Sequence, residues 1–322
     1  MGHLRSRRNR LKTFIQITEV WVPNRNRDAL EFHSGLYGPH QSFRLASERM
    51  HFGIDEGLPG KAWASRHPIV LKDLQHSYFL RSRQAQEAGL TCAIALPVFA
   101  GEHLLAVLVM FCAQDDESAG AVEVWHNAED KGLELTLEDG YYGILDGFEF
   151  AARHTRFPRA SGLPGIVWDS NLPLIVSDLG HNKRFLRRDD ARTAGLCTGL
   201  GLPSPYLPGH TYVVSFLSAL GTPIARRFEI WVPSQEHGGL RLHSAHCDND
   251  RQLPERLGDI TIERGLGALG RAWFTGIPTI TEHLDEDRSP NARAAADFGL
   301  TSMVSIPILN DGTTSAVVGL YL

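Results

Sequence analysis

The chain has 322 residues, of which 43% are apolar and 21% charged, and its formal net charge is −5. This length predicts two or three domains, the composition excludes a disordered or membrane-spanning chain, and the negative charge argues against general nucleic-acid binding. A basic run opens the chain, and no apolar stretch long enough for a signal peptide or membrane helix follows it: Arg5, Arg7, Arg8, Arg10 and Lys12. We therefore expect a cytoplasmic protein without membrane contact, whose first segment is solvated.

The first hundred residues predict a small antiparallel sheet with short helices packed on it. Stretches rich in β-branched and aromatic residues read as strands, and stretches rich in Ala, Gln and Glu that end at glycine read as helices. The expected elements are strands at 14–22 and 28–36, a helix at 58–65, a strand at 69–71, a helix at 79–88, and strands at 91–99 and 103–112. The fold class is therefore α+β, with five or six strands in the sheet.

The same pattern occurs three times along the chain. Trp63, Trp168 and Trp273 recur at a spacing of 105 residues, each preceded by a short glycine-containing motif. That motif is Gly57-Leu58-Pro59-Gly60 in the first copy, Gly162-Leu163-Pro164-Gly165 in the second and Gly267-Ala268-Leu269-Gly270 in the third. Further landmarks keep the same order: Glu19-Val20-Trp21, Glu123-Val124-Trp125 and Glu229-Ile230-Trp231, then Pro68, Pro173 and Pro278, then Pro97, Pro203 and Pro307. A period of this size indicates duplicated domains.

These residues resemble the GAF domain, a small-molecule and signalling module of bacterial sensor proteins. The resemblance also includes Asp73-Leu74, Phe79-Leu80-Arg81 and their counterparts in the second copy. It implies three GAF-like modules, at 1–113, 114–220 and 221–322, the last one divergent because Ala268, Leu269 and His283 replace the motif residues. It further implies a sensory protein that is not an enzyme. A scaffold that has lost its ligand and serves dimerisation or partner binding is the alternative, and a thiol-dependent reductase is the third option.

In GAF domains the ligand lies between the sheet and the inserted helices, which points to one group of residues in each of the first two copies. The candidates are Trp63, Asp73, His76, Tyr78, Phe79 and Cys92 in the first, and Trp168, Asp178, His181, Phe185 and Cys197 in the second. The histidines could hold a haem or an anion or respond to pH, or lie in a solvated loop. The aspartates could contact a ligand or accept backbone hydrogen bonds in a turn.

Other chemistry is not indicated. The four cysteines form no C-x-x-C pair, and the sequence contains no Cys-His dipeptide of the bilin-binding kind. Cys92 and Cys197 differ by one position along corresponding strands, so we expect their side chains on opposite faces rather than in a repeated thiol site. The sequence predicts no catalytic or metal-binding residues and names no cofactor. It leaves a small-molecule ligand and a protein partner or homodimer, formed through sheet or loop surfaces, as the expected partners.

Overall fold

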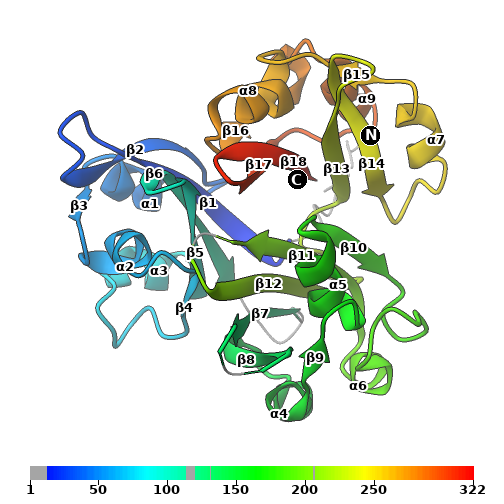
Figure 1. Cartoon of the computed structure of the whole chain (residues 1–322). Helices are drawn as coiled ribbons and strands as arrows, with labels where there is room; N and C mark the ends of the chain where they lie inside the picture. Colours follow the sequence, from blue (N-terminus) through cyan, green and yellow to red (C-terminus); the bar gives the residue numbers. More distant parts are fainter. Residues whose placement is uncertain (1–12, 114–119, 131, 206) are drawn as a thin grey trace, which may run out of the picture.

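The computed structural model describes residues 13–113, 120–130, 132–205 and 207–322, and the basic run at the start lies outside them. It contains three lobes, each built on a six-stranded antiparallel sheet. Figure 1 shows the lobes side by side around a common centre. We refer to the sheets and the helices packed on them as modules 1, 2 and 3. The predicted domain boundaries at 113/114 and 220/221 stay predictions.

Module 1 contains the elements expected from the sequence and two more, α1 and β3. Its elements are β1 (Ile15–Pro23), β2 (Ala29–Leu36), α1 (Gln41–Ser47), β3 (His51–Gly53), α2 (Gly57–Ser65), β4 (Ile69–Leu71), α3 (Ser82–Glu87), β5 (Leu90–Ala100) and β6 (His103–Ala113). The strand order across the sheet is β3-β2-β1-β6-β5-β4. The two long strands β1 and β6 therefore pair at its centre.

Modules 2 and 3 repeat this plan. Module 2 consists of β7 (Gly120–Ala128), β8 (Glu134–Tyr141), α4 (Asp146–His154), β9 (Phe157–Pro158), α5 (Gly162–Ser170), β10 (Leu174–Ser177), α6 (Arg188–Thr193), β11 (Leu196–Ser204) and β12 (His210–Ala219). Module 3 consists of β13 (Arg227–Ser234), β14 (Gly239–His246), α7 (Leu253–Leu257), β15 (Thr261–Ile262), α8 (Gly267–Thr275), β16 (Thr279–Thr281), the 3-10 helix η1 (Leu284–Glu286), α9 (Pro290–Ala296), β17 (Met303–Asn310) and β18 (Thr313–Tyr321). Equivalent strands follow the same order in all three sheets, which confirms the repeat and the fold class.

The glycines of the repeated motif have two different structural roles. The first one, at which α2 begins, has a positive φ of 56° at Gly57, which L side chains rarely adopt. The second one lies against a backbone carbonyl, because a Cβ on Gly60 would come within 2.1 Å of the Gly53 oxygen. Gly165 and Gly270 approach a carbonyl oxygen in the same way. The motif therefore holds the short helix tightly against the edge of the sheet.

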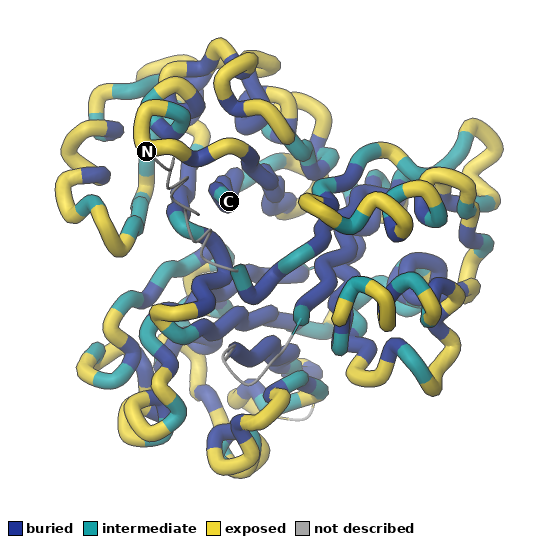
Figure 2. Tube along the Cα trace, turned by 180° about the vertical axis from the view of Figure 1, so that it is seen from behind, coloured by how far each residue is buried: buried dark blue, intermediate teal, exposed yellow. Residues whose placement is uncertain are grey.

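Both faces of each sheet are buried, one inside its own module and one at the shared centre. In β6, Val107, Val109 and Phe111 face the helices of module 1. The alternate residues face a core that all three modules share, in which Leu108 packs with residues such as Phe216 and Val318 of the other two. Figure 2 shows the buried segments gathered where the lobes meet. The sheet faces that we expected to mediate dimer contacts are thus largely occupied within the chain.

The modules form a closed ring through three equivalent junctions. Strand β4 contacts β8, β10 contacts β14, and β16 contacts β2. The repeated prolines Pro97, Pro203 and Pro307 meet at the centre around a cavity of only about 20 Å³. Each module therefore presents the same edge to the next, and the third closes on the first. Among the described residues, no helix is long and apolar enough to cross a membrane.

The tryptophans that anchor the cores are not the ones that the motif suggested. Trp63, Trp168 and Trp273 occupy equivalent places on α2, α5 and α8, but each is only partly buried. The fully buried tryptophans are Trp21, Trp125 and Trp231, on the central strands β1, β7 and β13. Because these strands are covered on both faces, their side chains lose all contact with solvent.

Candidate functional site

A buried ion pair occupies the space between the sheet and the helices in modules 1 and 2. In module 1, Arg81 immediately precedes α3 and binds Glu19 of β1 through two nitrogens, at 2.5 and 3.0 Å. The same glutamate accepts hydrogen bonds from Trp21 Nε1 at 3.0 Å and from the Tyr37 hydroxyl at 2.9 Å. The guanidinium also lies over aromatic rings, including Phe43 at 4.6 Å. Such a pair is stable when hydrogen bonds satisfy both charged groups.

Module 2 has the same arrangement. Arg187, immediately before α6, binds the two oxygens of Glu123 at 2.6 and 2.7 Å. Trp125 Nε1 and the Tyr142 hydroxyl donate to this carboxylate at 3.0 and 3.1 Å. The repeated Phe-Leu-Arg motif thus supplies the cation that ties the segment before the third helix to the sheet.

Module 3 retains the glutamate but takes its cation from a different element. Asn291 stands where Arg81 and Arg187 stand, and Arg227 of β13 binds Glu229 through Nε at 2.6 Å. Likewise Cys247 replaces the tyrosine of the other modules, and the Tyr321 hydroxyl of β18 donates to Glu229 at 2.7 Å. Burial raises the pKa of Glu229, which Arg227 and the hydrogen bonds oppose. All three ion pairs lie in closed cores, so we assign them a structural role.

The predicted aspartate–histidine pairs lie in solvent-exposed turns. Asp73 accepts backbone hydrogen bonds from Gln75 and His76 at 2.8 and 3.0 Å, and these bonds are the largest cause of its lowered pKa. The His76 ring lies 3.1 Å from the same carboxylate and is 85% exposed. In module 2, His181 pairs with Asp178 at 2.8 Å and is 69% exposed. Asp73 thus caps its turn, whereas the Asp178 carboxylate contacts, among the described residues, only the exposed His181 ring.

The remaining predicted residues of modules 1 and 2 lie in different places. Phe79 and Phe185 are buried against the arginine of their module's ion pair. Trp63 and Trp168 pack on the edge of the module cores, and Tyr78 is 39% exposed. Cys92 lies on the other face of the sheet, in the shared core, where burial raises its thiol pKa well above the ordinary value. Cys197 has a different environment, as expected from the one-residue offset.

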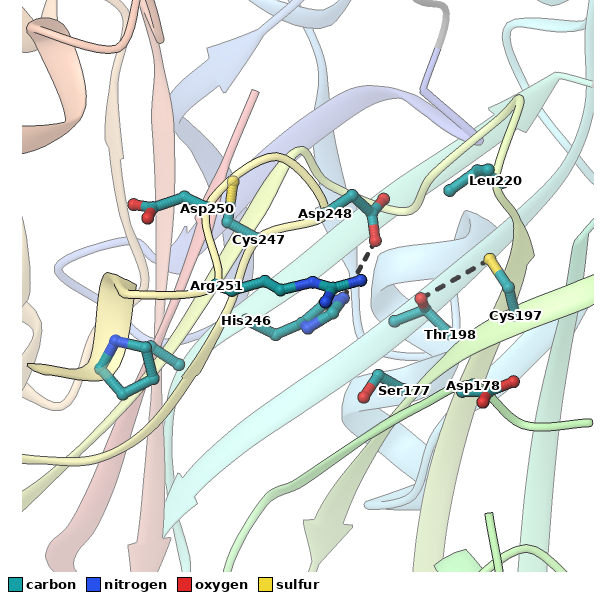
Figure 3. Close-up of a pocket in the computed structure, with 12 residues that line it drawn as sticks. Ser177, Asp178, Cys197, Thr198, Leu220, His246, Cys247, Asp248, Asp250 and Arg251 are labelled. Carbon is teal, nitrogen blue, oxygen red and sulfur yellow. Dashed lines mark hydrogen bonds and ion pairs between the residues drawn. The ribbon is translucent and has the colours of Figure 1, made fainter. Parts of the chain in front are cut away.

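A pocket of about 460 Å³ lies at the junction between modules 2 and 3 (Figure 3). Two of the predicted residues, Asp178 and Cys197, belong to its wall in module 2. The opposite wall is the end of β14 and the segment that follows it in module 3. The lining consists of Ser177, Asp178, Cys197, Thr198, Leu220, Ala245, His246, Cys247, Asp248, Asp250, Arg251 and Pro254. The sequence did not indicate this position, because a pocket between modules depends on how they assemble.

Side chains close the equivalent positions at the other two junctions. At the junction of modules 1 and 2, Lys72 forms an ion pair with Asp139, and the Tyr141 hydroxyl donates to Thr91 Oγ1 at 2.9 Å. At the junction of modules 3 and 1, Arg44 lies 3.3 Å from Glu282.

The pocket opens because smaller or differently paired residues occupy these positions between modules 2 and 3. Ser177 replaces the long Lys72 and Glu282, and Cys197 replaces Thr91. His246 stands where Tyr141 stands, but its ring bonds to Asp248 of its own module at 3.1 Å instead of reaching across. The cavity therefore results from the substitutions that distinguish this junction from the other two.

The pocket contains carboxylates from both modules and one cation free to pair. Burial raises the pKa of the Cys197 thiol, and the charges of Asp248 and Asp178 raise it further, so both carboxylates act on this sulfur. Asp250 is neutralised by an ion pair with Arg256. Arg251 is exposed and has no ion-pair partner among the residues that the structure describes. The thiol pKa therefore lies above its ordinary value, and the pocket is lined by carboxylates and a guanidinium.

Comparison with known families agrees with this architecture. Residues 19–126 match the family model for the GAF domain. The chain carries tandem GAF-like modules. The match covers module 1 from β1 and reaches into the first strand of module 2. No curated protein matches the chain.

Solved structures with the GAF fold also match, each over about one module. The nlh2 GAF domain of A. aeolicus in an inactive state is 21% identical, with 32% of this chain and 60% of that chain covered and a TM-score of 0.26. A GAF domain/HD domain protein from Geobacter sulfurreducens is 17% identical, with 32% and 65% covered and a TM-score of 0.27. The free methionine-R-sulfoxide reductase from Neisseria meningitidis, in complex with its substrate, is 19% identical, with 32% and 57% covered and a TM-score of 0.24. The matched regions thus span less than two thirds of each of these proteins.

The prediction that the chain is not an enzyme is wrong as an inference from the fold. The matching structures include reductases that act on free methionine sulfoxide, so a resemblance to GAF domains does not exclude catalysis. At these identities the matches transfer no activity to this chain. GAF-like architecture is established here by the strand order of the three sheets.

Proposed function

We propose that the chain is a small-molecule sensor whose ligand binds in the junction pocket between modules 2 and 3. The observation that carries the proposal is the asymmetry of the ring: two junctions are closed by ion pairs, and the third holds a cavity of about 460 Å³. This volume falls in the range of about 300–1,000 Å³ that is usual for small-molecule sites. A ligand there contacts two modules at once, so its binding is coupled to how firmly they associate.

The lining chemistry favours a small zwitterion such as an amino acid. Asp178 of module 2 and Asp248 of module 3 both line the pocket, and both charges raise the pKa of the Cys197 thiol. An ammonium group between them would gain from two carboxylates. Arg251 supplies the complementary partner for a carboxylate, which guanidinium binds in a two-pronged geometry. Leu220 and Pro254 add apolar surface for a side chain.

A panel of amino acids tested by thermal shift on the full chain examines this proposal. We expect one class of amino acid to stabilise the protein saturably, by about 2.7 kcal/mol at a concentration one hundred times its Kd. Ser177→Lys installs the residue of the closed junction and should abolish the shift. Lys72→Ser, the reverse change at the junction of modules 1 and 2, is the matched control and should leave it intact. The proposal fails when no amino acid stabilises the protein, or when Ser177→Lys responds like the unmodified chain.

A further inference from the structure

Three aromatic rings stack across the junction between modules 1 and 2, and a fourth lies edge to edge with the last of them. His67, which precedes β4 in module 1, stacks on Tyr212 of β12 with ring centroids 4.8 Å apart. Tyr212 stacks in turn on His126 of β7 at 4.4 Å. The His210 ring lies beside His126 in nearly the same plane, with the ring centroids 5.1 Å apart. The planes are nearly parallel, with angles of 10°, 17° and 9°. Three titratable rings therefore take part in one inter-module contact.

The hydrogen-bonded imidazoles of His126 and His210 accommodate one added proton but not two. His126 Nε2 lies 2.8 Å from His210 Nδ1, a hydrogen bond that needs one N–H and one free lone pair. The other nitrogen of His126 lies 3.3 Å from Glu138 of β8, which can neutralise a single imidazolium. A second proton would place two N–H groups face to face. Doubly protonated, the pair loses its hydrogen bond and gains charge repulsion.

The surroundings disfavour protonation of His126. Burial is the largest cause of its lowered pKa, Glu138 opposes it, and the charges of His210 and His67 lower the pKa further. The other charged groups at this junction, Lys72 and Asp139, are paired with each other. The unfolded or opened chain, with an ordinary histidine pKa of about 6.5, thus takes up protons before the closed one does.

The equivalent positions at the other two junctions are aliphatic. Leu172 and Ile277 stand where His67 stands, and Val232 and Val22 stand where His126 stands. These four side chains pack against the shared core. At these two positions the ring thus carries titratable side chains at one junction and aliphatic side chains at the other two.

We propose that the junction between modules 1 and 2 is a pH-sensitive joint, closed while the His126–His210 pair carries one added proton or none and opened when both imidazoles are protonated. Because closure depresses protonation, the stabilisation is fully present above about pH 6.5 and is lost as the pH falls through the lower pKa of the closed state. The closed ring would then open at one defined place. This device is independent of ligand binding between modules 2 and 3.

Hydrogen exchange of the full chain between pH 7.5 and 5.5, corrected for the intrinsic pH dependence, tests the proposal. Amides of β4 and β8 should exchange faster on acidification, by about tenfold for each unit by which closure lowers the pKa. Amides of β10 and β14, and of β16 and β2, should not follow. The double variant His67→Leu/His126→Val carries the residues of the junction between modules 2 and 3 and should lose the response.

Either of two results would overturn the joint: an equal response at all three junctions, or a response that persists in the double variant. The unmodified chain contains its own controls in the other two junctions. The comparison among junctions therefore decides the matter even when the double variant does not fold.

Discussion

Modules 1 and 2 differ from module 3 in which element neutralises the buried glutamate. In the first two, the arginine precedes the third helix and fastens that segment to the central strand. In module 3, the arginine lies on the same strand as the glutamate, and the tyrosine comes from the last strand. The third helix then reaches the pair only through a neutral side chain, because Asn291 of α9 donates to the Tyr321 hydroxyl at 2.8 Å. Asp287, ahead of that helix, accepts a hydrogen bond from the Ala268 amide of α8 at 2.8 Å.

All three modules keep a buried glutamate paired with an arginine, but the arginine comes from a different element in module 3. A glutamate two residues before a buried tryptophan accepts the indole N–H in all three modules. Once that carboxylate is buried it requires a cation, and any element that places a guanidinium beside it satisfies the requirement. In module 3, loss of the tyrosine leaves Cys247 at the pocket wall. The divergent ion pair and the open junction therefore involve the same segment.

The largest effect is expected on breaking the glutamate–arginine pair of module 1 or module 2. Arg187→Leu leaves Glu123 buried without its cation and should destabilise the protein by about 3–5 kcal/mol. Chemical denaturation measures the loss. Adding Glu123→Gln to Arg187→Leu removes the unpaired charge and should recover part of the stability. Equal stability of the single variant and the unmodified chain would show that the pair does not hold α6 to the sheet.

A somewhat smaller effect on stability is expected from the difference between the strand tryptophans and the motif tryptophans. Trp125→Ala should cost about 3–5 kcal/mol because the ring is fully buried and leaves a cavity. Trp168→Ala should cost roughly half as much, because this ring is only partly buried at the edge of the module core. Melting temperatures of the two variants, compared in the full chain, rank them. The reverse order would mean that the motif tryptophan is the true anchor.

The smallest effect distinguishes module 1 from module 2. The Ser47 hydroxyl donates to Glu19 at 2.6 Å, whereas Ala152 occupies the equivalent position in module 2. Ser47→Ala should therefore cost only about 1 kcal/mol, the usual net value of one hydrogen bond. Urea titration resolves a change of this size. A loss several times larger would show that module 1 depends on this hydroxyl in a way that module 2 does not.

The repeat and most elements could be predicted from the sequence because their signals are local. The glycine motif reports a turn and a close backbone approach, and the strands show dense β-branched patterning. Helix α1 and strand β3 were missed because the seven-residue Gln41–Ser47 and three-residue His51–Gly53 segments are too short for a periodic pattern. The Glu-Val-Trp landmark marked the start of each copy, but its ion pair joins residues 62 positions apart in module 1.

The candidate site was less predictable because it arises from assembly. The sequence singled out Asp178 and Cys197, but the pocket also needs residues 245–254 of the next module, and no local pattern connects these segments. The apolar runs of β5, β11 and β17 indicated burial without showing that their outer faces meet at a common centre. That one junction is open and two are closed becomes visible only when equivalent positions are compared in the folded ring.

Chemical-shift mapping of the isotopically labelled full chain, titrated with the amino acids that stabilise it, tests the central claim most directly. The account predicts saturable shifts that cluster at residues 177–178, 197–198 and 245–254, on both walls of the junction between modules 2 and 3. The closed junctions, reported by Thr91 and Tyr141 and by Arg44 and Glu282, should remain unchanged. Shifts centred between the sheet and helices of a single module, or at a closed junction, would contradict it.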